Sequence, residues 1–423
     1  MRLTLEPVRA DGPILELAAV LEHPAGERQR LWWRLPAEWR DAVTPWADPF
    51  VIAFLFPIMQ WQRDVIVEGT VSPSLLANLE QYMALWRAWR PDLYQPVDIR
   101  AREETEAPAP SVAGQAIAPL SCGVDSSFTV FRHTRRLAGR QSRPIGATIV
   151  LHGFDITLEQ ENSNGMYEGL LADARAMARS LDLPCVPITA NLHELPTIWY
   201  HSFGTFLNSA LRLLSARFDV ALFPNDVPYT RMQVAWGSHP VSNPLLSSRH
   251  FQVIDDGPET TRFEKIQLLA QWPEAMRHLH VCLVNWGSHA NCCRCEKCIR
   301  TILSFRVAGV DLPPTFERDV KAWQIRRTHL HSEQSARRWM EIIRGAQQHG
   351  LGTPDWVKAM HTAIRLNRIR WKYKQMKLPF IPLRNRLRGL FRGSPLSRRQ
   401  STGRECNAAS RTGVSAPAPS RPT

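Results

Sequence analysis

The sequence lacks an apolar run long enough to cross a bilayer. A membrane-spanning helix needs roughly 20 apolar residues, and the most apolar run, at 49–59, is about half that length. The N-terminus also lacks the apolar stretch of a secretory signal peptide. We therefore expect a cytoplasmic protein without a transmembrane segment, in which residues 47–59 form a buried core helix.

Most of the chain also lacks net charge, although the whole carries +13. From Arg365 to Thr423 there are 15 basic residues and one acidic residue, so the remainder sums to −1. A neutral body argues against a nucleic-acid surface spread over the globular part. RNA is therefore only a weakly supported partner, through the basic tail.

Length and composition predict an ordinary globular enzyme with more than one part. The chain has 423 residues, of which 44% are hydrophobic and 22% charged. A single domain commonly holds about 100–200 residues. We expect five regions: a Trp-rich α+β domain (1–105), a linker (106–115), a main α/β domain (116–310), a helical region (311–380) and a basic disordered tail (381–423).

The first region combines strand patterns with aromatic residues. Alternating residues predict strands at 3–8, 14–22, 28–35 and 65–69, and Ser72 precedes a helical pattern. Seven of the 15 Trp residues lie before residue 90. We interpret them as an aromatic core, and a Trp-lined substrate surface is the alternative.

The main domain alternates short apolar strands with amphipathic helices, which predicts a doubly wound parallel sheet. The expected strands lie at 117–120, 145–155, 185–190 and 220–224, and the expected helices at 127–136, 166–181 and 203–217. Ligands of such sheets bind at the carboxyl ends of the strands. The loop at 121–126, residues 152–155 and the turn after Phe223 should therefore share one edge.

Residues 117–133 read as a strand, a small polar loop and the start of a helix. Free backbone amides and the positive helix end make this arrangement an anion site. Gly123 would let the backbone approach a phosphate closely. Asp125 would repel a bare phosphate but could hold the Mg²⁺ that accompanies ATP.

The loop Ser121-Cys122-Gly123-Val124-Asp125-Ser126 resembles the Ser-Gly-Gly-x-Asp-Ser signature of the PP-loop ATP pyrophosphatases. The resemblance implies an adenine nucleotide α-hydrolase-like fold that cleaves ATP between its α and β phosphates. It implies that the loop, with Ser127, holds pyrophosphate, and that His152 and Gly153 lie near adenine and ribose. Cys122 replaces the first Gly of the signature, so it would be strained if that position requires a positive φ.

Five of the eight cysteines fall within 17 residues, Cys282 to Cys298. Cys292, Cys295 and Cys298 form a Cys-x₂-Cys-x₂-Cys motif, and with Cys282 they predict a tetrahedral Zn²⁺ site. Because four thiolates leave no open position, such a zinc would be structural. Either Cys293 or His289 could replace one ligand, and an iron–sulfur cluster is the minor alternative.

The same cysteine pattern is similar to the zinc motif of the 7-cyano-7-deazaguanine synthase branch of that superfamily. The similarity covers roughly residues 116–305, and the Trp-rich region and the basic tail fall outside it. It therefore indicates a divergent, queuosine-synthase-like relative rather than that enzyme itself.

Three further segments carry candidate groups. Gly237, Ser238 and His239 could contact a carboxylate or phosphate of the substrate, although a plain surface turn is equally credible. Arg262 and Lys265 share a helix face and could neutralise α-phosphate charge, or form a solvated charged face. The basic amphipathic pattern at 356–378 predicts a helix that could alternatively lie on an anionic membrane.

Together these features predict an ATP-dependent, adenylate-forming C–N ligase that uses Mg²⁺ and contains Zn²⁺. The resemblance implies an amide- or nitrile-forming reaction between a small acid or modified base and ammonia or an amine. The rival interpretations are sulfur transfer to a nucleobase or tRNA, and a non-catalytic, zinc-stabilised nucleotide-binding module. The acceptor and the oligomeric state stay open, and a homodimer is one option.

Overall fold

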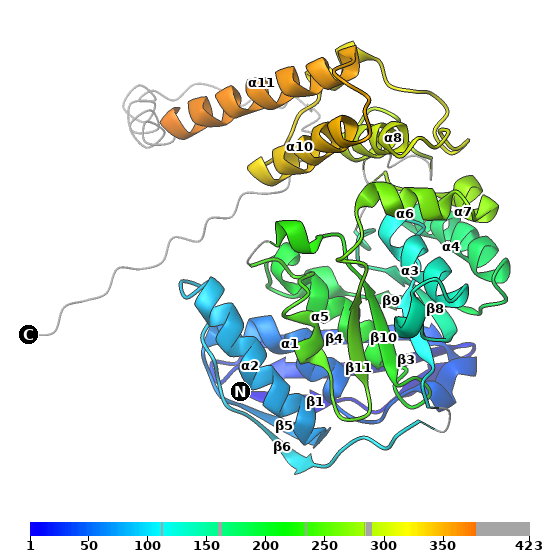
Figure 1. The fold of residues 1–423 in the computed structure, drawn as a ribbon. Coiled ribbons are helices and arrows are strands. Elements are labelled where there is room, and N and C mark those ends of the chain that lie inside the picture. Colours follow the sequence, from blue (N-terminus) through cyan, green and yellow to red (C-terminus); the bar gives the residue numbers. More distant parts are fainter. Residues whose placement is uncertain (111–112, 160–162, 233–234, 283, 285–289, 378–423) are drawn as a thin grey trace, which may run out of the picture. The chain divides into compact units, whose positions relative to one another are not determined.

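The computed structural model describes residues 1–110, 113–159, 163–232, 235–282, 284 and 290–377. The chain divides into two units, Met1–Asn367 and Arg368–Thr423. The predicted tail at 381–423 lies outside the described residues. All of the sheet and most of the helices belong to the first unit, which is described below (Figure 1).

One sheet of 11 strands forms the centre of the first unit, in the order β11-β10-β7-β8-β9-β4-β3-β1-β5-β6, with β2 beside β3. Its strands are β1 (Arg2–Leu5), β2 (Arg9–Asp11), β3 (Ile14–Glu22), β4 (Arg28–Pro36), β5 (Val65–Val71), β6 (Ile99–Glu104), β7 (Ala116–Pro119), β8 (Ile145–His152), β9 (Cys185–Ala190), β10 (Val220–Pro224) and β11 (Gln252–Asp256). Most neighbouring pairs are parallel, so the sheet is mixed but predominantly parallel.

Eleven α-helices accompany the sheet in the described part of the chain. They are α1 (Asp48–Trp61), α2 (Pro73–Trp89), α3 (Val124–Thr134), α4 (Ser163–Arg179), α5 (Trp199–Arg212), α6 (Arg262–Leu269), α7 (Pro273–His278), α8 (Glu296–Ala308), α9 (Ala322–Arg327), α10 (Glu333–Gln348) and α11 (Asp355–Lys377). The described residues form no helix with both the length and the apolar character that crossing a membrane requires.

The five strands β11, β10, β7, β8 and β9 run parallel and carry helices on both faces. Alternate residues such as Ile149 and Val186 pack in one core with α1 and α5. Their neighbours, such as Val150, are buried on the opposite face, where α3 and α4 contact the strands. The predicted α/β class is therefore confirmed, and the carboxyl ends of these strands meet at one edge.

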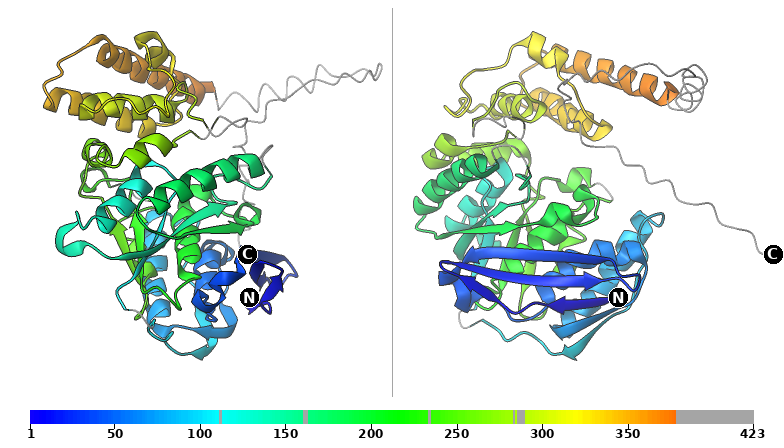
Figure 2. Two further views of the ribbon diagram at one scale, coloured as in Figure 1. Left: turned by 90° about the vertical axis from the view of Figure 1, so that its right-hand side faces the viewer. Right: turned by 180° about the vertical axis from the view of Figure 1, so that it is seen from behind.

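The N-terminal strands extend this sheet. Trp33 pairs with Ala190 and Arg34 with Thr189, which joins β4 to β9 in antiparallel orientation. Asn191 continues the junction, since its side chain accepts from the Trp32 amide at 2.9 Å. From behind, β1, β3 and β4 form one blue layer in front of helices (Figure 2). The sheet thus runs through both the expected 1–105 and 116–310 regions.

Aromatic and apolar residues fill the interior of the N-terminal part. The predicted helix at 47–59 is confirmed as α1, in which 12 of 14 residues are buried. Trp33 and Trp86 are fully buried. The aromatic-core interpretation therefore holds for these two Trp residues.

Candidate functional site

The loop between β7 and α3 is closed by serine hydrogen bonds. The Ser121 amide donates to Ser126 Oγ at 3.2 Å, and the two hydroxyl oxygens lie 3.0 Å apart. Ser126 Oγ also donates to the Gly123 carbonyl at 3.3 Å. On the other side, the His280 amide donates to the Cys122 carbonyl at 2.9 Å. The protein itself thus supports the shape of this loop.

The first amides of α3 remain available as donors. Gly123 is the N-cap, and its carbonyl accepts from the Ser127 amide at 3.0 Å. Among the residues that the structure describes, no group accepts a hydrogen bond from the amides of Val124, Asp125 or Ser126. Three donors at the positive end of a helix dipole are suited to a phosphate oxyanion.

Cys122 adopts a left-handed backbone conformation, with φ of +55°. An L residue in this region is strained, and glycine would avoid the strain. The side chain is fully buried, and burial raises the pKa of its thiol well above the usual value. A buried, protonated thiol is a poor nucleophile, so Cys122 is a loop residue rather than a reactive cysteine.

Two cations of α6 bind the carboxylate of Asp125. Lys265 Nζ lies 2.8 Å from Oδ1 and Arg262 Nη1 lies 3.3 Å from Oδ2. Lys265 also donates to the Asn225 carbonyl at 2.6 Å, and Arg262 to Thr301 Oγ1 at 3.2 Å. Burial would raise the pKa of Asp125, but the charges of Lys265 and Arg262 lower it far below its usual value. The structure therefore brings all three predicted residues together.

Three further basic side chains, which sequence reasoning missed, belong to this cluster. Lys297 and Arg300 lie on α8, and Arg338 lies on α10. Each interacts electrostatically with Arg262, and Figure 1 shows α8 and α10 on the same side of the sheet as α6. Burial, with the charge of Arg300, lowers the pKa of Arg262 to about 10. The i, i+3 spacing of Lys297 and Arg300 is the sequence signal for a shared face.

His152 ends β8 and Gly153 follows it, and the two residues have different surroundings. The His152 ring stacks on Tyr167 with centroids 4.4 Å apart, and burial lowers its pKa. The two rings line a cavity of about 450 Å³ together with Trp32. Gly153 has a φ of +82°, and a Cβ there would meet the Ala190 carbonyl oxygen at 1.7 Å. Gly153 therefore permits close packing of two backbone segments.

The turn at 237–239 packs against α5. A Cβ on Gly204 would meet the Gly237 carbonyl oxygen at 1.9 Å. Ser238 and His239 are 2% and 3% exposed, and the His239 ring lies 4.8 Å from that of Trp89. These contacts provide a packing role for the turn.

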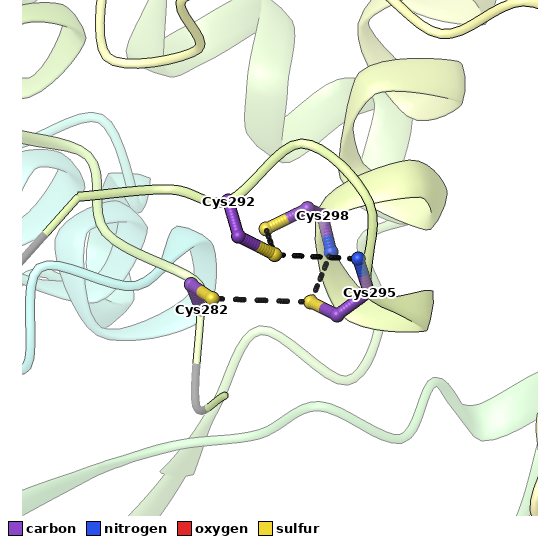
Figure 3. A group of neighbouring side chains, drawn as sticks. All are labelled: Cys282, Cys292, Cys295 and Cys298. Carbon is purple, nitrogen blue, oxygen red and sulfur yellow. Dashed lines mark hydrogen bonds between the residues drawn. The ribbon is translucent and has the colours of Figure 1, made fainter. Parts of the chain in front are cut away.

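Four cysteines form a cluster that could hold a metal such as zinc (Figure 3). The Sγ atoms of Cys282, Cys292, Cys295 and Cys298 all lie within 4.8 Å of one another. The Cys282–Cys295 and Cys292–Cys298 sulfur pairs are each 3.9 Å apart. A tetrahedron of thiolates with Zn–S bonds of about 2.3 Å has edges of about 3.8 Å, so the donor set fits Zn²⁺.

Backbone amides orient two of these sulfurs. Cys292 Sγ accepts from the Cys295 amide at 3.3 Å, and Cys295 Sγ accepts from the Cys298 amide at 3.4 Å as the N-cap of α8. Cys293 Sγ instead donates to the Asn291 carbonyl at 3.4 Å. The predicted four-ligand set is thus assembled without Cys293, and the alternative ligand His289 lies outside the described residues.

The cysteine cluster is connected to the loop by a short segment. Asn291 holds this segment, because its side chain accepts from the Val281 amide at 2.9 Å and donates to the Leu279 carbonyl at 2.8 Å. Between them, His280 makes the hydrogen bond to Cys122.

Comparison of the chain with protein-family models, curated proteins and solved structures finds no match.

Proposed function

We propose that the protein is an ATP-dependent, adenylate-forming enzyme of the PP-loop type that joins an acid to ammonia or an amine. The observation that carries the proposal is the set of amides of Val124, Asp125 and Ser126, unpaired within the described residues, beside the Asp125–Lys265–Arg262 cluster. Oxyanion donors, cations and a carboxylate at one edge of a parallel sheet are the groups that nucleotide chemistry requires.

The chain's own residues would act mainly by binding and charge neutralisation. A carboxylate oxygen of the acceptor attacks the α-phosphorus of ATP, and the bond to the bridging oxygen of pyrophosphate breaks. The α3 amides bind the β-phosphate of the leaving pyrophosphate, while Arg262 and Lys265 neutralise the charge that develops on the phosphate oxygens. The amine nitrogen then attacks the acyl carbon of the mixed anhydride, loses a proton and displaces AMP.

Magnesium would accompany the nucleotide, and Asp125 is the carboxylate that would hold it. Both Asp125 oxygens contact cations in this structure, so binding of Mg²⁺–ATP would require Arg262 or Lys265 to move to the phosphates. Mg²⁺ supplies charge neutralisation at the β and γ phosphates when bound. Zinc on the four cysteines would have a supporting role, since a fully ligated ion cannot bind substrate.

The direct test is release of AMP and pyrophosphate from Mg²⁺–ATP in the presence of a panel of carboxylic acids and ammonia. We expect Asp125→Asn to reduce the rate at least about 100-fold, whereas Asp355→Asn, which changes an exposed acid, should leave it unchanged. Binding of ATP without hydrolysis for any acid would favour a non-catalytic nucleotide-binding module. No binding of ATP would refute the proposal.

A further inference from the structure

Two cations of α8 lack a full complement of charge partners. Within the described residues, Lys297 Nζ forms no hydrogen bond and no ion pair within 4 Å, although the side chain is half-buried, and the charge of Asp155 acts on it only from a longer distance. Arg300 is only 8% exposed, and among the described residues its side chain has one ion-pair contact, from Nε to Glu296 Oε1 at 3.3 Å. That same carboxylate oxygen also accepts from Trp339 at 2.9 Å. Two charges are thus removed from bulk water with little compensation.

The other cations nearby each lie within 4 Å of a carboxylate, but two of them share one. Asp125 pairs with Lys265 and Arg262, and Asp226 pairs with Arg338 at 2.9 Å. One positive charge is therefore in excess at Arg262 and Lys265, and a second at Lys297, next to the Arg300–Glu296 pair. Because partly buried cations in excess of the nearby carboxylates are costly, Lys297 and Arg300 are suited to an anionic ligand. Within the described residues, the terminal nitrogens of Arg300 form no hydrogen bond or ion pair, and its buried Nε forms no hydrogen bond.

Arg262 connects this pair of cations to the loop. One terminal nitrogen contacts Asp125 on α3, and the other donates to Thr301 on α8. Thr301 follows Arg300 directly, and Lys297 lies one helical turn earlier. An extended polyanion that starts at the α3 amides and passes Arg262 would therefore reach Lys297 and Arg300.

We propose that Lys297 and Arg300 bind the terminal phosphate of a triphosphate whose inner phosphates occupy the amides of α3. The proposal rests on the function proposed above. It assigns the γ-phosphate site to α8, the helix whose N-cap is Cys295 of the cysteine cluster. A guanidinium and an ammonium offer several charge-assisted donors to one phosphate. The site should therefore prefer triphosphate to diphosphate and have no effect on AMP.

The experiment measures equilibrium binding of ATP, AMP, pyrophosphate and inorganic triphosphate, each with Mg²⁺, to the full chain. Variants Lys297→Gln and Arg300→Gln are compared with Arg294→Gln, which changes an exposed basic residue in the same segment. We expect the first two to weaken ATP and triphosphate binding about tenfold or more, with AMP unchanged. Arg294→Gln should bind all four ligands like the unmodified protein.

The metal content of every variant is measured, and ligand affinities are compared only among variants that keep their metal. Lys297→Met serves as a second substitution at position 297. Unchanged affinity for ATP and triphosphate in both Lys297 variants and Arg300→Gln would overturn the proposal and point to an anionic acceptor as the ligand of α8. Triphosphate binding that depends on Lys297 without any ATP binding would support the anion site while refuting the ligase function. Adenylate formation that is independent of Lys297 and Arg300 would support the ligase function while refuting the γ-phosphate site.

Discussion

The backbone amide of His280 donates a hydrogen bond to the carbonyl of Cys122 at 2.9 Å. It joins the residue before the α3 N-cap to a segment that ends, two residues later, at Cys282 of the cysteine cluster. The conformation of the loop and the integrity of the cluster are therefore coupled through a backbone contact, which side-chain substitution at His280 would leave in place.

Cys122 provides a test of the left-handed backbone. Both Cys122→Gly and Cys122→Ala remove the buried sulfur, but only glycine relieves the strain at a φ of +55°. We expect the Gly variant to be more stable than the Ala variant by about 1 kcal/mol in urea unfolding. Equal stability of the two variants would show that the loop is not strained at this position.

The cysteine cluster predicts a metal content of one ion per chain. Cys298→Ser should lose the metal and be destabilised, because Cys298 lies in the first turn of α8 and metal binding contributes to folding. Cys293→Ser is the matched control, since that sulfur contacts the Asn291 carbonyl instead. Elemental analysis measures the metal content of both purified variants. Metal retention in Cys298→Ser would contradict the assignment of this residue as a ligand.

Asp255 should make stability depend on pH. Burial raises its pKa from 3.8 to about 7, so the folded protein retains a proton that the unfolded chain releases. Stability attributable to this group is then full below about pH 4 and lost as pH rises to about 7. Asp255→Asn should flatten this dependence and stabilise the protein at pH 8 by about 1 kcal/mol or more.

The surroundings of Asp255 accommodate that change. Its oxygens accept from the side chains of Asn225 and Asn243, and Asn243 Oδ1 has no hydrogen-bond partner in the described part of the chain. Rotation of the Asn243 amide would present this oxygen to the new amide group. Asp41→Asn, at an exposed position, is the control, and thermal unfolding between pH 4 and 8 makes the comparison. An unaltered pH profile in Asp255→Asn would exclude this carboxyl as its source.

Arg132 separates the contributions of a buried and an exposed carboxylate. It lies 2.7 Å from Asp256, which is 2% exposed, and 2.6 Å from Glu259, which is 50% exposed. Asp256→Ala should cost about 3–5 kcal/mol because it leaves Arg132 buried without its main partner. Glu259→Ala should cost less than about 1 kcal/mol. Chemical denaturation measures the free energy of unfolding of the two variants. Similar losses of stability in both would contradict this ranking.

Local patterns predicted the elements inside the sheet but not those at its edges. The strands β3, β4 and β8 carry long alternating or apolar patterns. By contrast, β6 reads Ile-Arg-Ala-Arg-Glu-Glu and β11 reads Gln-Val-Ile-Asp-Asp. Both are terminal strands of the sheet, where one side is not covered by a neighbour and polar residues are tolerated. Their sequences therefore carry a weak strand signal.

The candidate site shows the same division between local and distant relationships. The four cysteines could be predicted because three of them lie within seven residues. The contact of Lys265 with Asp125 joins residues 140 positions apart, and Arg338 is still more distant. Only the fold brings them together, so helix periodicity could identify Arg262 and Lys265 as neighbours but not the carboxylate that they bind.

The antiparallel seam at Trp33 and Ala190 has a practical consequence for dissecting the molecule. A fragment that begins at residue 116 would make β9 an edge strand with unpaired backbone hydrogen-bonding groups. It would also expose apolar side chains that the N-terminal part covers. Such a fragment should self-associate through the uncovered strand. Separate production of the two halves would then yield aggregates, whereas their co-production could restore the joined sheet.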